Sequence, residues 1–275
     1  MNKYVVIVLA WLILMTIPNG RAAAENEAPQ LFSESAVLMD ADTGQVLFEK
    51  NMHTQMYPAS ITKVLTVLLG IEKGQLNDRI TMTRQAVFSI PRGASHIALD
   101  EGEQITLEQA LMAAMLPSAN DASNGIAEHI SGSVSEFARL MNQRAREAGA
   151  LNSNFVNPHG LPDKNQVTTA YDMAMITRAA MQNKEFREIF GTVHYIIPPT
   201  NKQPESRDLW SEHRMLTTNL YYYDGVIGGK TGYTKESQNT LVTAARRGDR
   251  ELIAVVMKSE NFGVYKDTIA LFDYG

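Results

Sequence analysis

Residues 61–71 are apolar on nearly every side of the helix that they predict. Lys63 is the only charged residue in this stretch of mainly Ile, Val and Leu. A helix that is hydrophobic all round belongs in a protein interior, so other elements of the chain must cover it on every side. Burial and a first-turn position both disfavour a lysine's charge and lower its pKa. A residue that breaks two local rules is a candidate functional residue.

Ser60 stands three residues before Lys63, in a helix that we expect from about Ser60 to Glu72. Residues three apart share one helix face, so the two side chains should touch. A neutral Lys63 would accept the hydroxyl proton of Ser60, and backbone N–H groups at the helix start would stabilise a developing oxyanion. The alternative is a capping serine beside a solvated surface lysine. The apolar setting of Lys63 argues against that alternative.

A second motif, Ser118-Ala119-Asn120, directly follows Pro117 and lies between two predicted helices. Ser118 offers a hydroxyl that relays a proton to a leaving group, and Asn120 offers an amide for the substrate or for the lysine. Taken alone, the motif is more typical of a turn or a helix cap.

The third motif is Lys230-Thr231-Gly232, in a glycine-rich stretch after the β-like run 221–223. Lys230 and Thr231 would bind a carboxylate, and glycines such as Gly232 let a substrate backbone lie close to a strand. The N–H of Tyr233 would be a second oxyanion donor. A β-turn is the structural alternative. A P-loop is excluded because Asp224 stands where that motif needs glycine.

The three motifs together supply a nucleophile, a base, a proton relay and a carboxylate anchor. This set of groups favours acyl transfer through a serine ester. The six histidines show no metal-ligand spacing, and scattered acidic pairs give no glycosidase pattern, so we expect no metal and no cofactor.

The first 24 residues predict an export signal. Lys3 gives a positive start, residues 5–17 form an apolar run, and residues 22–24 form an Ala-x-Ala cleavage site. The 13-residue run is shorter than the ~20 residues of a membrane-spanning helix, which is the alternative. We therefore expect an exported protein without a stable membrane span after cleavage, with residues 25–275 as one catalytic domain.

Composition narrows the function further. The chain has 44% hydrophobic residues, enough for a sizeable core, and no cysteine, so it forms no disulfide. Its net charge of −5 becomes about −7 after removal of the signal, which carries Lys3 and Arg21 but no acid. A mildly acidic domain has no electrostatic footprint for nucleic acid.

Strand patterns at both ends of the chain enclose a helical middle, which predicts an α+β fold. β-Hairpins are expected over residues 36–49 and 240–257, and the two hairpins should pair in one antiparallel sheet. Besides the helix at 60–72, we expect helices over residues 106–116, 121–130, 133–148, from 169 onward, 185–190 and 264–274. Residues 80–105 and 157–168 are expected to be irregular.

The order of the motifs resembles the S-x-x-K, S-D-N and K-T-G set of class A β-lactamases and penicillin-binding proteins. With Ala119 inside the second motif, the chain resembles the serine D-alanyl-D-alanine carboxypeptidases, which are low-molecular-mass penicillin-binding proteins. The likeness covers nearly all of residues 30–275. Its further matching segments are 57–63, 118–123, 157–161, 169–174 and 229–234.

This resemblance implies roles for the motif residues. Ser60 would be the acyl-ester nucleophile, Lys63 its proton acceptor and Ser118 the second active-site serine. Asn120 would contact the substrate, and Lys230 would bind its carboxylate.

The resemblance also implies a substrate, a place and a fold. The substrate would be a peptidoglycan stem peptide ending in D-Ala-D-Ala, which loses its last D-Ala, and β-lactams such as penicillin would inhibit the reaction. The enzyme would act on the cell-wall side of the cytoplasmic membrane or in the periplasm. The fold would be the penicillin-recognising one: a five-stranded antiparallel sheet flanked by helices, with a helical lobe.

Three features depart from the family pattern. Tyr233 replaces a frequent histidine. No arginine occurs between Lys258 and Ala270, where many relatives carry one, so either Lys230 would act with less help or Lys258 or Lys266 would substitute for the arginine. Relatives continue into a small β-rich domain and an amphipathic membrane helix, which we expect to be absent here unless the sequence is a fragment.

Three other functions share these motifs. A DD-endopeptidase would use the same site on cross-linked peptidoglycan. A class A β-lactamase would need a Glu-x-x-Leu-Asn motif, which is missing between Asn120 and Lys230. A non-hydrolytic penicillin or peptidoglycan sensor would need a transmembrane signalling segment, and the sequence shows no clear one.

Overall fold

A computed structural model describes residues 28–275, and the predicted export signal lies outside this range. Its centre is a five-stranded antiparallel sheet, as the resemblance implies, and its strands lie in the order β2-β1-β9-β8-β7. The strands are β1 (Ser35–Asp40), β2 (Val46–Lys50), β7 (Val226–Thr234), β8 (Gln238–Arg247) and β9 (Arg250–Ser259). The two predicted hairpins meet where β1 pairs with β9, with Ser35 opposite Met257. The first strand of the chain thus closes onto its last.

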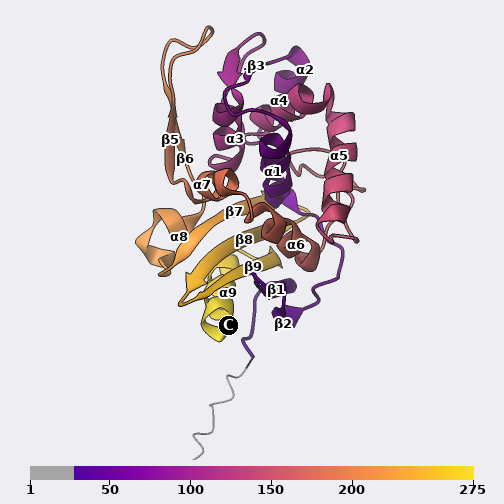
Figure 1. Ribbon diagram of the computed structural model, residues 1–275, viewed down its shortest axis with the longest axis vertical. Coiled ribbons are helices and arrows are strands. Elements are labelled where there is room, and N and C mark those ends of the chain that lie inside the picture. Colours follow the sequence, from indigo (N-terminus) through magenta and orange to yellow (C-terminus); the bar gives the residue numbers. More distant parts are fainter. Residues whose placement is uncertain (1–27) are drawn as a thin grey trace, which may run out of the picture.

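Helices cover both faces of the sheet (Figure 1). Ala36 and Leu38 point to the face covered by α9 (Gly263–Tyr274), where they join one apolar cluster. Val37 and Met39 point to the opposite face and join the larger core, which includes α6 (Ala170–Ala180). Alternate residues of a strand face opposite sides, and both sides are covered here, so the whole of β1 is buried.

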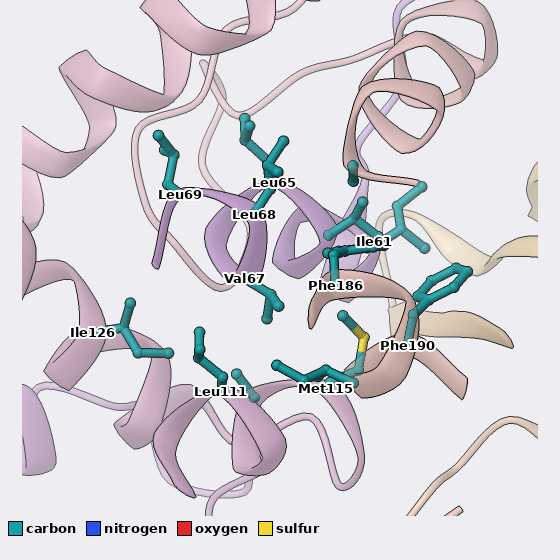
Figure 2. Close-up of a cluster of buried hydrophobic side chains, with 14 of the residues drawn as sticks. Ile61, Leu65, Val67, Leu68, Leu69, Leu111, Met115, Ile126, Phe186 and Phe190 are labelled. Carbon is teal, nitrogen blue, oxygen red and sulfur yellow. The ribbon is translucent and has the colours of Figure 1, made fainter. Parts of the chain in front are cut away.

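The helix α1 (Lys63–Lys73) lies in the middle of a helical lobe. It is surrounded by α3 (Leu107–Met115), α4 (Asn120–Ser131), α5 (Val134–Glu147), α6 and α7 (Lys184–Gly191). Figure 2 shows side chains on several sides of α1, such as Leu65 and Val67, among apolar residues of neighbouring helices. Residues 63–70 are all buried, so the prediction from the apolar run is confirmed.

The predicted helix starts at residues 106 and 133 are also confirmed. Thr106 and Gln109 form a complete capping box at the start of α3. Ser133 Oγ accepts the backbone N–H of Glu136 at the start of α5. The start of α1 differs from the prediction: residues 59–62 form a 3₁₀ turn, η1 (Ala59–Thr62), and the α-helix begins at Lys63.

Two predictions about local structure were wrong. Residues 80–105 are not irregular throughout, because β3 (Arg79–Thr81) pairs with β4 (Gln104–Thr106) around the short helix α2 (Arg84–Phe88). Residues 221–223 are not a strand: a 3₁₀ turn, η2 (Asn219–Tyr221), ends there and β7 starts at Val226. Tyrosines favour strands, but Tyr221 stacks on Tyr265 of α9 and Tyr223 packs against Phe272 of the same helix, and this tertiary packing overrides the propensity.

The remaining elements lie between the lobe and β7 in the sequence. They are β5 (His194–Ile197), β6 (Arg207–Trp210) and α8 (Arg214–Thr217). β5 and β6 form an antiparallel ribbon that extends beside the helical lobe (Figure 1). Within residues 28–275, no helix is both long and apolar enough to cross a membrane.

Candidate active site

A cleft of about 700 Å³ opens between the helical lobe and the edge strand β7. It gathers residues from segments far apart in the chain. Six of the eight predicted site residues line it, namely Ser60, Ser118, Asn120, Thr231, Gly232 and Tyr233. The other two, Lys63 and Lys230, are buried.

Ser60 and Lys63 touch, as their spacing predicts. Ser60 lies in η1 at the end of α1 that faces β7, and its Oγ is 3.0 Å from Lys63 Nζ. Lys63 Nζ also donates to Asn120 Oδ1 at 2.7 Å and to the His159 carbonyl at 2.9 Å. Burial holds the pKa of Lys63 well below its ordinary value, and the charge of Lys230 lowers that pKa further. A lysine in this setting is suited to accept a proton from a neighbouring hydroxyl.

The loop 157–161 holds the serine turn in place. Gly160 has φ +85°, and a side chain at this position would overlap the carbonyl of Ala59, so only glycine allows so close an approach. The Pro158 carbonyl accepts from Thr66 Oγ1 at 2.6 Å, which fastens the loop to α1. The loop also forms part of the cleft wall, since Gly160 and Leu161 line the cleft.

Ser118 occupies a strained position between α3 and α4. Its φ is +63°, and its buried Oγ has no hydrogen-bond partner among the described residues. Buried hydroxyls nearly always have a partner, and strained backbone is frequent at functional sites. Asn120 follows at the start of α4, where its Oδ1 accepts from Lys63. The second motif is therefore joined directly to the first.

The third motif lies on β7, next to η1. A side-chain carbon on Gly232 would sit 2.9 Å from the backbone nitrogen of Ser60, so the strand passes very close to the serine. Lys230 is buried beneath the cleft, with Nζ 3.0 Å from the Thr231 carbonyl. Burial lowers the pKa of Lys230 to about 8, although the nearby Glu212 carboxylate opposes the shift. Tyr233 is exposed at the cleft.

The lysines expected to replace the missing arginine do not line the cleft. Lys258 Nζ donates to a Glu34 carboxylate oxygen at 2.9 Å. Lys266 Nζ lies 5.8 Å from the ring centre of Phe32. This expectation was wrong because both side chains interact with the segment 31–34, at the start of the described chain.

Sequence reasoning missed two charged residues of the cleft. Among the residues that line the cleft, Glu212 is the acidic one and Arg214 the basic one. Thr231 Oγ1 donates to Glu212 Oε2 at 3.3 Å, and the Arg214 guanidinium lies 3.9 Å from the ring centre of Phe262. Neither residue belongs to a motif, and each stands more than ten positions before Lys230, so no local pattern pointed to them.

Between residues 28 and 275, no three His, Cys, Asp or Glu side chains form a group that could hold a metal ion.

Known proteins with similar sequences were found for most of the chain. A family model described as D-alanyl-D-alanine carboxypeptidase matches residues 22–261. The D-alanyl-D-alanine carboxypeptidase DacF of Bacillus subtilis is 37% identical over 82% of this chain and 57% of its own length. DacB2 of Mycobacterium tuberculosis is 32% identical over 88% of this chain and 82% of its own length.

The fold is also similar to solved structures of DD-peptidases. A crystal structure of a D-alanyl-D-alanine carboxypeptidase from Mycobacterium tuberculosis superposes with a TM-score of 0.83 at 28% identity, covering 92% of this chain and 94% of that one. The Streptomyces K15 DD-transpeptidase superposes with a TM-score of 0.83 at 26% identity, covering 90% and 98%. The chain spans less than two thirds of the length of several curated relatives, such as DacF.

Proposed function

Because the chain belongs to the D-alanyl-D-alanine carboxypeptidase family, we propose that it is a serine hydrolase that removes the last D-Ala from peptidoglycan stem peptides. The observation that carries this proposal is the 3.0 Å contact between Ser60 Oγ and the buried Nζ of Lys63. It joins a nucleophile to a base whose pKa is lowered by burial.

The reaction would proceed in two steps. Ser60 Oγ attacks the carbonyl carbon of the D-Ala-D-Ala bond, and Lys63 Nζ takes the serine proton. The proton held by Lys63 passes through Ser118 to the departing amine, which leaves Lys63 neutral again, and D-Ala leaves while the rest of the peptide stays on Ser60 as an ester. Water then attacks the ester, a proton returns to Ser60, and the shortened peptide is released with its new carboxylate.

Substrate binding is assigned to the remaining cleft residues. Asn120 would hold the peptide amide, and Lys230 with Thr231 would bind the terminal carboxylate. The backbone N–H groups of Ser60 and Tyr233 would receive the oxyanion. Arg214 would take the place of the arginine that is missing between positions 258 and 270. It lines the cleft, and it has no carboxylate partner among residues 28–275.

The proposal is tested by intact mass after mixing with benzylpenicillin, with peptide mapping of the adduct and a D-Ala release assay. An adduct on Ser60 together with D-Ala release supports the carboxypeptidase. An adduct with cleavage of cross-linked dimers alone points to a DD-endopeptidase, and an adduct without any turnover points to a sensor. Rapid multiple-turnover loss of penicillin would identify a β-lactamase.

The pH dependence of substrate recognition follows from Lys230. Its pKa of about 8 means that Lys230 loses its charge above about pH 8, and attraction for a carboxylate falls with it. We expect the KM for a D-Ala-D-Ala peptide to rise above this pH, while the KM for the same peptide with an amidated C-terminus stays flat. Glu212→Gln is the control: Glu212 raises the pKa of Lys230, so its neutralisation should move the rise to lower pH. An unmoved or oppositely moved profile would contradict this role.

Arg214 is expected to distinguish free carboxylates from amides. Removal of a charged hydrogen-bond donor weakens binding by about tenfold, so Arg214→Ala should raise KM by about that factor for a free-carboxylate peptide. The amidated peptide should change little, and Arg214→Lys should recover part of the loss. Steady-state kinetics on both peptides checks this. An equal loss on both would show that Arg214 acts only through its packing on Phe262.

The place of action is proposed from residues 1–24. The predicted signal supports export, so the enzyme would act on the cell-wall side of the cytoplasmic membrane or in the periplasm. N-terminal sequencing of exported protein should find Glu25 as the first residue; protein recovered only in the cytosol with Met1 intact would reject export.

A further inference from the structure

A second pocket, of about 560 Å³, adjoins the cleft on the helical lobe. The segment 91–98 separates the two hollows. Gly93 lines both of them; Ala94 and Ser95 line the cleft, whereas Arg92 and His96 line the second pocket. No atom lies within 4 Å of the position that a side chain on Gly93 would take. A bound peptide therefore has room to cross from the cleft into the pocket at this point.

The wall between the hollows is fixed to the proposed catalytic residues. The backbone N–H of Asn120 donates to the Ser95 carbonyl at 2.9 Å. The next residue, Asp121, accepts the N–H of Leu99 at 3.1 Å and that of Ile97 at 3.2 Å. The pocket consequently keeps a constant position relative to Asn120, the residue assigned to the substrate amide.

Two of the three carboxylates in the pocket are already satisfied. Glu103 is fully buried and accepts both guanidinium nitrogens of Arg207, at 2.7 and 3.0 Å. Asp121 is occupied by backbone N–H groups. Only Asp100 is an exposed acid, and its carboxylate accepts the N–H of Glu101. Glu103 and Asp121 are therefore engaged within the fold, whereas Asp100 keeps an exposed negative charge at the pocket.

Two basic side chains of the pocket, unlike Glu103 and Asp121, have no partner within the described residues. Arg92 and Lys202 are exposed, and neither side chain has a hydrogen bond or an ion pair with any residue between 28 and 275. His96 accepts the N–H of Ala98 at Nδ1, so its neutral ring carries a proton on Nε2 and can donate there. The apolar part of the lining includes Phe88, whose side chain is 58% exposed. An anionic group attached to an apolar stem matches this combination.

We propose that the second pocket is a substrate subsite that binds a carboxylate-bearing residue on the N-terminal side of the D-Ala-D-Ala terminus. This inference rests on the proposed function, since it extends the peptide bound in the cleft. With the scissile carbonyl at Ser60 and its amide on Asn120, the preceding residues would leave the cleft beside Ser95 and Gly93. Because Gly93 lines both hollows, an extended chain at about 3.3 Å per residue would enter the pocket shortly before the D-Ala-D-Ala terminus.

The test compares two peptides that end in D-Ala-D-Ala and differ only in carrying Glu or Gln two residues before that dipeptide. Their dissociation constants are measured by titration calorimetry on Ser60→Ala protein, which removes hydrolysis. The Glu peptide should bind about five- to tenfold more tightly at low salt, and this preference should shrink at high salt. Arg92→Ala with Lys202→Ala should abolish the preference without changing the Gln peptide.

The matched control is Lys73→Ala with Arg146→Ala, which removes the same two charge types from exposed positions outside both hollows. It should retain the preference. Equal binding of the two peptides by the parent protein, or a preference that survives Arg92→Ala with Lys202→Ala, overturns the subsite. Equal loss in both double variants would assign the effect to net charge and also overturn it.

Failure of the proposed function gives a different result. Benzylpenicillin labelling and D-Ala release are run in parallel on protein with Ser60 intact. The Arg92→Ala, Lys202→Ala protein should keep the labelling rate of the parent, because neither side chain lines the cleft. Absence of labelling in the parent would reject the serine acyl-enzyme, whereas the binding preference would still decide the subsite.

Discussion

Ser60→Ala is expected to abolish covalent labelling by benzylpenicillin and to lower D-Ala release by at least a factor of about 10⁴. The hydroxyl is the atom that would form the ester, and no neighbouring group can replace it without moving. Lys63 would keep its hydrogen bonds to Asn120 and His159, so the fold should survive. Intact mass, single-turnover labelling and the melting temperature measure these effects together.

The control for this prediction is Ser118→Ala. Ser118 lines the same cleft and its buried Oγ has no hydrogen-bond partner among the described residues, so it is the other candidate hydroxyl. Labelling of Ser118→Ala should be slower than in the parent but still map to Ser60. A stable adduct that survives Ser60→Ala and disappears in Ser118→Ala would reverse the two assignments.

Lys63→Met is expected to slow acylation by a factor of about 10³–10⁴, near the upper end of what a general base contributes. Methionine roughly keeps the side-chain length but cannot take a proton. The substitution also leaves the Asn120 and His159 oxygens without their donor, and each buried unpaired group costs about 1–3 kcal/mol. The melting temperature should therefore fall as well, and acylation must be measured well below it.

Lys63→Arg separates chemistry from structure. An arginine keeps donors for the surrounding oxygens but stays protonated, so it cannot act as a base. Acylation should remain as slow as in Lys63→Met while the melting temperature recovers in part. Acylation within about tenfold of the parent would mean that Lys63 only positions Asn120. In the parent, acylation should decrease as the pH falls through the lowered pKa of Lys63, because protonation removes the base.

Periodicity alone carried the prediction of the buried helix. Residues 61–71 are apolar on nearly every face of the helix. Because an apolar face is buried in a folded protein, this pattern alone predicts that other elements surround the helix. The same holds for Ser60 and Lys63, whose contact follows from a three-residue spacing near the helix start. The sheet was predictable because both hairpins alternate and carry glycine turns.

Tertiary contacts decided the features that the sequence did not predict. Tyr221 and Tyr223 have strand propensity, but both pack against rings of α9, a helix that follows much later in the chain, and β7 begins only at Val226. Ser118 gives no local sign of its positive φ or of its unpaired hydroxyl. Such properties depend on which distant segments surround a residue.

The sequence by itself determined the buried helix, the two hairpins and the residues that carry the proposed chemistry, because spacing and apolar pattern act between near neighbours. Only the tertiary structure decided which charges line the cleft. Glu212 and Arg214 entered it, whereas Lys258 and Lys266 turned toward residues 31–34. The physical reason is that a cleft forms where remote segments meet, and the direction of each side chain there follows from packing that no single segment encodes.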